Sequence, residues 1–145
     1  MSLLSNPITN TLELATELSR LSKLATRRRD SYFLTSSGTF TLSTLVRHAS
    51  SRGISIHLWK KDTNVEHVIC GTESMTETMV RLVEELRASF ITCKSYMAWM
   101  RENGIKPNLV CMWKKGKSTP RLSAFIQIAV EELGYELTLR KDITE

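Results

Sequence analysis

Hydrophobic residues recur at helical spacing near the start of the chain. Over residues 10 to about 30, one helical stripe consists of Leu14, Leu18, Leu21 and Ala25. Asn10 or Thr11 can cap the start of this helix. A second helix is predicted from about Ser43 to Ser51, because Gly53 follows it as a stop signal.

Two runs of alternating apolar residues predict a β-hairpin further along the chain. Residues 54–59 and 65–70 flank Asp62-Thr63-Asn64, and a three-residue loop with Asn64 left-handed would connect them. That register places Ile56 and Leu58 on the same sheet face as Val68 and Cys70. A shorter β pair is predicted upstream, where residues 32–35 and 39–41 flank a Ser-Ser-Gly turn.

Beyond Gly71 the pattern predicts a run of helices and a final strand. The helices span about 74–88, 92–103, 107–115 and 121–133. After Gly134, residues 135–139 alternate like a strand, which we expect at the edge of a sheet. The predicted fold class is mainly α with a small β component (α+β). An N-terminal helix and β-hairpin module (1–72) precedes a helix-turn-helix bundle (73–145) that ends in the short strand.

The module over residues 1–72 has two readings. Its order of helix, short strand, helix and hairpin is compatible with a winged-helix unit whose wing is the Lys60-Lys61 hairpin. The alternative is a small α+β module that forms a dimer or packs on the C-terminal half. We favour the alternative, because residues 41–53 carry little basic charge for a recognition helix.

Positive charge is concentrated in the C-terminal half. The chain has a formal net charge of +5 and a pI near 9.3. Seven basic residues and one acid, Glu102, lie between Lys94 and Arg121, whereas the flanking segments 73–87 and 122–145 are acidic. A second basic cluster consists of Arg20, Lys23 and Arg27-Arg28-Arg29. A basic segment indicates a polyanionic partner.

Other functional classes have little support in the sequence. The three cysteines, Cys70, Cys93 and Cys111, show no metal-site or disulfide spacing, and we expect reduced thiols in largely buried positions. Since the histidines are scattered and no phosphate-binding Gly-rich loop occurs, we expect no catalysis, no metal and no cofactor. With neither a membrane span nor a signal-peptide pattern, the expected location is the cytoplasm, in association with the nucleoid.

The basic segment contains a turn followed by a helix. Gly104 suits a tight turn and Pro107 the first helical position, while Val110, Trp113 and Leu109 are expected to face inward. A helix of this kind can enter the major groove of DNA. The candidate DNA-binding residues are Lys94, Ser95, Lys106, Asn108, Met112, Lys114, Lys115, Lys117, Ser118 and Thr119. Asn108 can pair with adenine, Lys106 can reach guanine or phosphate, and Met112 can touch a thymine methyl, whereas residues 114–119 suit the sugar-phosphate backbone.

Residues from about 74 to 140 resemble the helix-turn-helix domain of the Cro and phage-repressor type, the XRE family. Gly104 corresponds to the turn glycine, Val110 and Trp113 to the anchors of the recognition helix, and Gly116 to its closing glycine. The proline loop and closing helix of the family are matched by Pro120, Leu122, Ile128 and Leu133-Gly134. Met100 and Asn103 stand where the family usually has a small and an apolar residue. Residues 1–72 resemble no family that we can name.

The segment GIKPNLVCMWKKG is also similar to the turn-helix segment of small transposase-associated proteins. Both resemblances imply binding to double-stranded DNA. We therefore expect a sequence-specific transcriptional regulator of phage or mobile-element type, a repressor, that reads the major groove with residues 107–115. A homodimer is expected, because one such helix contacts only a short half-site. The alternatives are a protein-interaction module of antitoxin or anti-repressor type and a transposase-associated DNA-binding protein.

Overall fold

The computed structural model describes residues 2–22 and 40–142, which form an α+β fold as the sequence predicts. The helices are α1 (Thr11–Ser22), α3 (Leu42–Ser50), α4 (Thr72–Ala88), α5 (Cys93–Glu102), α6 (Pro107–Lys114), α7 (Leu122–Ile126) and the π-helical η1 (Gln127–Glu132). The strands are β1 (Ser2–Leu4), β2 (Ile54–Lys60), β3 (Val65–Ile69) and β4 (Glu136–Asp142). No helix in these described segments is long and apolar enough to cross a membrane.

The strands form one antiparallel sheet in the order β1-β4-β2-β3. The final strand, β4, therefore lies inside the sheet, and the prediction of an edge strand was wrong. Leu137 of β4 pairs with Leu58 of β2, and Leu139 pairs with Ile56, while β1 pairs along the other side. A strand with one buried face alternates in the same way at an edge and in the interior of a sheet, so its pattern does not reveal its position.

The predicted hairpin is confirmed, but its register differs from the prediction. Asn64 is left-handed with φ 53°. Lys60 pairs with Val65, so the turn contains four residues, 61–64, in place of three. Ile56 consequently pairs with Ile69, and Leu58 with His67. Because a shift of one residue moves every side chain to the opposite face, Val68 and Cys70 point away from the core.

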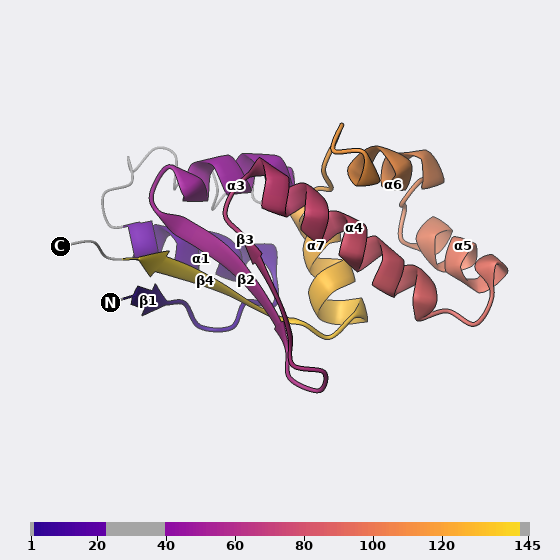
Figure 1. Ribbon diagram of the computed structural model, residues 1–145, viewed down its shortest axis with the longest axis horizontal. Helices are drawn as coiled ribbons and strands as arrows, with labels where there is room; N and C mark the ends of the chain where they lie inside the picture. The colour runs from indigo at the N-terminus through magenta and orange to yellow at the C-terminus, as the bar shows by residue number, and fades with distance from the viewer. Residues whose placement is uncertain (1, 23–39, 143–145) are drawn as a thin grey trace.

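One hydrophobic core joins the two predicted halves of the chain. Figure 1 shows α1 and α3 on one face of the sheet, with α4 running from the sheet toward α5 and α6 at the far end. Buried residues of one cluster come from both sides of Gly71, and β2 and β4 hydrogen-bond across the predicted boundary. The boundary between 1–72 and 73–145 thus coincides with the start of α4, but it does not separate two sheets or two cores in the described residues.

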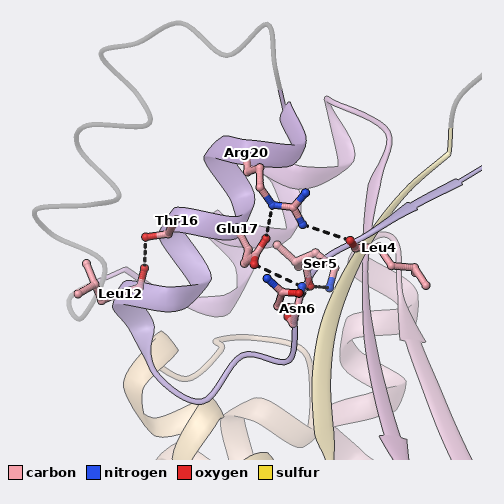
Figure 2. Close-up of polar contacts among 8 residues, drawn as sticks. Leu4, Ser5, Asn6, Leu12, Thr16, Glu17 and Arg20 are labelled. Carbon is pink, nitrogen blue, oxygen red and sulfur yellow. Dashed lines mark hydrogen bonds and ion pairs between the residues drawn. The ribbon is translucent and has the colours of Figure 1, made fainter.

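The segment before α1 is fixed to the sheet by polar contacts (Figure 2). Ser5 exchanges hydrogen bonds with the backbone of Leu139, and its Oγ accepts from the Leu139 N–H at 2.8 Å. The buried Glu17 carboxylate accepts from the Asn6 N–H at 3.3 Å and from Arg20 Nε at 2.7 Å. Arg20 also donates to the Leu4 carbonyl. Arg20 therefore stabilises the contact between α1 and the segment before it. The other basic residues of its cluster, Lys23 and residues 27–29, lie outside the described residues, as does the predicted strand pair except for Phe40 and Thr41.

A polar network connects α4 to the sheet. Glu85 accepts hydrogen bonds from Lys60 Nζ and from the Tyr135 hydroxyl, both at 2.7 Å, and that hydroxyl lies 3.2 Å from His67 Nε2. Burial alone would raise the pKa of Glu85, but the hydrogen bonds from Lys60 and Tyr135 hold it below its usual range. Burial lowers the pKa of His67, whereas burial and the nearby Glu85 carboxylate raise the pKa of Tyr135.

The cysteines are exposed, so the prediction of largely buried thiols was wrong. Cys70 directly follows β3, Cys93 is the first residue of α5, and Cys111 lies on the outer side of α6. Each position is at an element end or on a solvent-facing helix side, where a small apolar side chain is tolerated without burial.

Candidate nucleic-acid interface

The helices α5 and α6 are joined by a tight turn that the sequence correctly indicates. Gly104 adopts φ 71°, a conformation that favours glycine, and the Ile105 N–H donates to the Met100 carbonyl at 2.8 Å. Ile105 is buried directly after the turn. These contacts end α5 and set the direction in which α6 leaves.

Asn103, which departs from the family pattern, has a clear role in this turn. Its Nδ2 donates to the Trp99 carbonyl at 2.7 Å, and its Oδ1 accepts from Gln127 Nε2. The side chain thus closes the last turn of α5 and holds η1 beside it. Met100, the other departure, is buried between α4, α5 and α6.

The helix α6 rests on the core through two residues. Val110 is 9% exposed and Trp113 is 4% exposed, as predicted for anchors. Leu109, however, is 39% exposed, so the expectation that it faces inward was wrong. Successive helical residues are rotated by about 100°, which puts Leu109 at the side of the helix and not beneath it.

The outer side of α6 forms an exposed ridge. By the same rotation, Asn108, Met112 and Lys115 lie opposite the two anchors, with Cys111 beside them. Met112 is 38% exposed, and the other members of the ridge are also exposed. Together, Asn108, Met112 and Lys115 form the α6 ridge.

Hollows lie on both sides of α6. On the α4 side, an apolar hollow of about 430 Å³ is lined by residues of α4, α5 and α6. On the α7 side, a polar hollow of about 540 Å³ includes Leu109, Trp113, Arg121 and Gln127. Since the surface recedes on both flanks, α6 is presented as a projecting rod.

Four of the five predicted lysines lie on α6 or within three residues of its ends, and the fifth, Lys94, belongs to α5. Lys94 is in the first turn of α5, Lys106 immediately precedes α6, and the others lie at or after its end. The exposed members of the predicted set are Lys94, Ser95, Lys106, Asn108, Met112, Lys114, Lys115 and Lys117. No side-chain cap satisfies the first turn of α6, so its N-terminus keeps a positive dipole end near Lys106 and Asn108.

Two of the three predicted hydroxyl residues, Ser95 and Thr119, have structural contacts instead. Ser95 forms a capping box with Thr92, in which the Ser95 N–H donates to Thr92 Oγ1 at 3.0 Å. Thr119 Oγ1 accepts from the Ser43 N–H at 3.0 Å and so caps the start of α3. Ser118 Oγ is buried and has no hydrogen-bond partner among the described residues. Thr119 and Ser118 therefore direct their hydroxyls away from the surface on which the lysines lie.

Arg121 was not among the predicted site residues. It is exposed, precedes α7 and lines the polar hollow beside α6. The sequence feature that could have identified Arg121 as a site residue was its position in the basic segment 94–121. In the described part of the chain, no three His, Cys, Asp or Glu side chains are grouped so that they could hold a metal ion.

Comparisons with models of protein families, with curated proteins and with solved structures give no match to this chain.

Proposed function

We propose that this chain is a sequence-specific double-stranded DNA-binding regulator, a repressor of transcription, that inserts α6 into the major groove. The observation that carries the proposal is the α6 ridge, which is exposed, flanked by hollows and surrounded by lysines while Val110 and Trp113 anchor the opposite side. We also propose a binding role without catalysis.

The size and chemistry of α6 suit the major groove. Eight residues at a rise of about 1.5 Å per residue give a rod of about 12 Å, comparable with the groove width. Asn108 is in the first turn, where a side chain can pair with the N6 and N7 atoms of adenine. Met112, one turn later on the same side, can contact a thymine methyl. Lys106 can reach guanine or a phosphate at the helix N-terminus.

The remaining cations support phosphate contacts beside α6. Lys117 and Arg121 follow α6 in the chain, and Lys94 lies at the start of the preceding helix α5. Lys114 and Lys115 are at the C-terminal end of the helix itself. Contacts of this kind fix orientation on the duplex and add affinity without reading sequence.

A homodimer is part of the proposal, since two copies would read two half-sites. The strand β3 is at the edge of the sheet, and its Val68 side chain is 40% exposed on the open sheet face. Edge strands with exposed apolar residues are suited to pairing with another strand. We therefore propose antiparallel pairing of β3 with its copy as the dimer contact.

Selection of bound duplexes from a random pool tests the proposal. A palindromic consensus would support sequence-specific binding by a symmetric dimer. Lys106→Glu and Lys115→Glu should each abolish enrichment, because they place negative charge against the duplex. Arg81→Glu on α4 is a matched control that should still select the same sequence. If the two α6 variants selected the wild-type sequence as well as the control does, α6 would not be the reading helix.

A protein-binding role is the second candidate. Leu109 and Met112 expose apolar surface next to the lysines, and such surface also suits an antitoxin-like or anti-repressor contact. The pool selection separates the two, because a protein-interaction module would enrich no duplex sequence.

A further inference from the structure

The apolar hollow beside α6 is bounded by three helices whose side chains do not fill the space between them. Val83 and Ala88 of α4 form one wall, Met97 and Met100 of α5 a second, and Val110 of α6 a third. Its volume of about 430 Å³ falls within the range of small-molecule sites and far exceeds a packing defect.

Carbon and sulfur dominate the lining of this hollow. Water inside it finds few hydrogen-bond partners, so an apolar molecule could displace that water favourably. Two methionines contribute flexible and polarizable side chains, which adapt to ligands of varied shape. The interior therefore suits a hydrocarbon group.

The charged lining residues are exposed and thus lie at the mouth of the hollow. They are Arg87 at the end of α4, Lys114 at the end of α6 and Glu84. The Arg87 guanidinium lies 5.6 Å from the centre of the Tyr96 ring, which is itself part of the lining. Two cations against one acid favour an anionic group at the mouth.

We propose that this hollow is a binding site for a small apolar carboxylic acid, with its hydrocarbon part between α4, α5 and α6 and its carboxylate near Lys114 and Arg87. The site is separate from the α6 ridge, because Pro107, Val110 and Lys114 lie on the α4 side of α6. An occupant would contact α6 directly and so support the helix proposed to read DNA. This last consequence rests on the proposed function, whereas ligand binding itself does not.

The test is a titration of the full-length chain with octanoate. The chain is labelled with ¹³C at the methionine methyl groups, and the binding is followed by methyl NMR. Met97 and Met100 line the hollow, while the core residues Met75 and Met79 and the ridge residue Met112 do not. Octanoate should shift the Met97 and Met100 signals saturably and leave those of Met75, Met79 and Met112 in place. Absence of saturable shifts at Met97 and Met100, or equal shifts at Met75, Met79 and Met112, would overturn the site. No DNA is present, so this result is independent of the proposed function.

Two substitutions test the two parts of the ligand separately. Ala88→Phe, at an exposed helix end, should fill the hollow and abolish the shifts. Lys114→Gln should weaken octanoate binding about three- to tenfold, because it removes a charged donor from a partly screened site. The matched control Lys61→Gln, in the exposed turn between β2 and β3 and outside the hollow, should leave the affinity unchanged. Equal affinity of wild type for octanoate and 1-octanol, or an unchanged affinity in Lys114→Gln, would overturn the carboxylate assignment.

Discussion

The Tyr135 hydroxyl is the centre of the contact between α4 and the sheet, and Tyr135→Phe removes it with little change in shape. The hydroxyl donates to Glu85 Oε2 at 2.7 Å and lies 3.2 Å from His67 Nε2. Tyr135 itself is buried, so the phenylalanine ring retains the apolar packing. The substitution therefore tests the network and not the core.

The expected loss follows from the type of hydrogen bond. A bond to a charged acceptor contributes about 1.5–3 kcal/mol, and a neutral one about 0.5–1.5 kcal/mol. Glu85 has 34% of its side chain exposed, so water can replace part of the lost bond. We therefore expect Tyr135→Phe to reduce the free energy of unfolding by about 1.5–2.5 kcal/mol, a large part of the total stability of a typical domain.

Urea denaturation measures this loss as a lower midpoint with an unchanged slope. Glu85→Gln and the double variant complete a mutant cycle, in which the coupling between Tyr135 and Glu85 should be about 1 kcal/mol or more. A loss below about 0.5 kcal/mol in Tyr135→Phe, or additive effects of the two substitutions, would refute the assigned role of the hydroxyl.

Four further predictions concern other parts of the molecule. Burial lowers the pKa of His67, so wild type should lose stability as the pH falls below 6.5, the ordinary value, and on through the lower pKa of the folded chain. In His67→Gln this loss of stability should be absent until the pH falls below 4.5, where protonation of Glu85, whose pKa is lowered in the folded chain, begins to reduce stability. Urea midpoints measured across a pH series provide the test. A pH profile of His67→Gln that equals that of wild type would contradict the role of His67. Gly104→Ala has room for its methyl group but keeps φ at 71°, so thermal unfolding should show a cost of about 1–2 kcal/mol, and no cost would mean that the turn relaxes. Glu17→Ala should leave the Asn6 N–H and Arg20 without their carboxylate partner, and urea denaturation should show a free energy of unfolding lower by about 1–3 kcal/mol. An effect within experimental error would mean that Glu17 does not stabilise the N-terminal contacts. Val68→Glu should convert the proposed dimer to a monomer in light scattering, and persistence of the dimer would exclude the β3 edge as its contact.

The sequence predicts the local features of the α5–α6 unit well. Thr92 caps α5, Gly104 takes the left-handed conformation, and Val110 and Trp113 anchor α6, all as expected. Each of these depends on residues within a few positions of one another, so short-range rules are sufficient. Leu109 is the exception, because it lies at the side of α6 and faces a hollow that tertiary packing leaves between α6, α7 and the loop before α7.

Features that depend on distant pairing were not predictable in the same way. The strand β4 lies inside the sheet because it pairs with both β1 and β2. The alternation of apolar and polar residues along a strand is the same whether its neighbour is an edge strand or an interior strand, so it does not reveal this order. The Thr119 hydroxyl accepts a hydrogen bond from the N–H of Ser43, 76 residues earlier in the chain. The sequence does not show this distant contact, and the hydroxyl was therefore predicted to bind phosphate. The hollow between α4, α5 and α6 likewise arises from tertiary packing around Met100, and no local pattern indicates it.

Binding of a mixed-sequence duplex at increasing salt, followed by fluorescence anisotropy, tests the central claim that the surface around α6 binds DNA. The affinity of wild type should fall steeply, with a log–log slope of about −0.9 for each phosphate contacted. Lys106→Gln combined with Lys115→Gln should reduce the magnitude of that slope by about two, whereas Arg81→Gln combined with Arg140→Gln, which removes the same charge elsewhere, should leave it unchanged. No binding of wild type at low salt, or equal slopes in the two double variants, would contradict the claim.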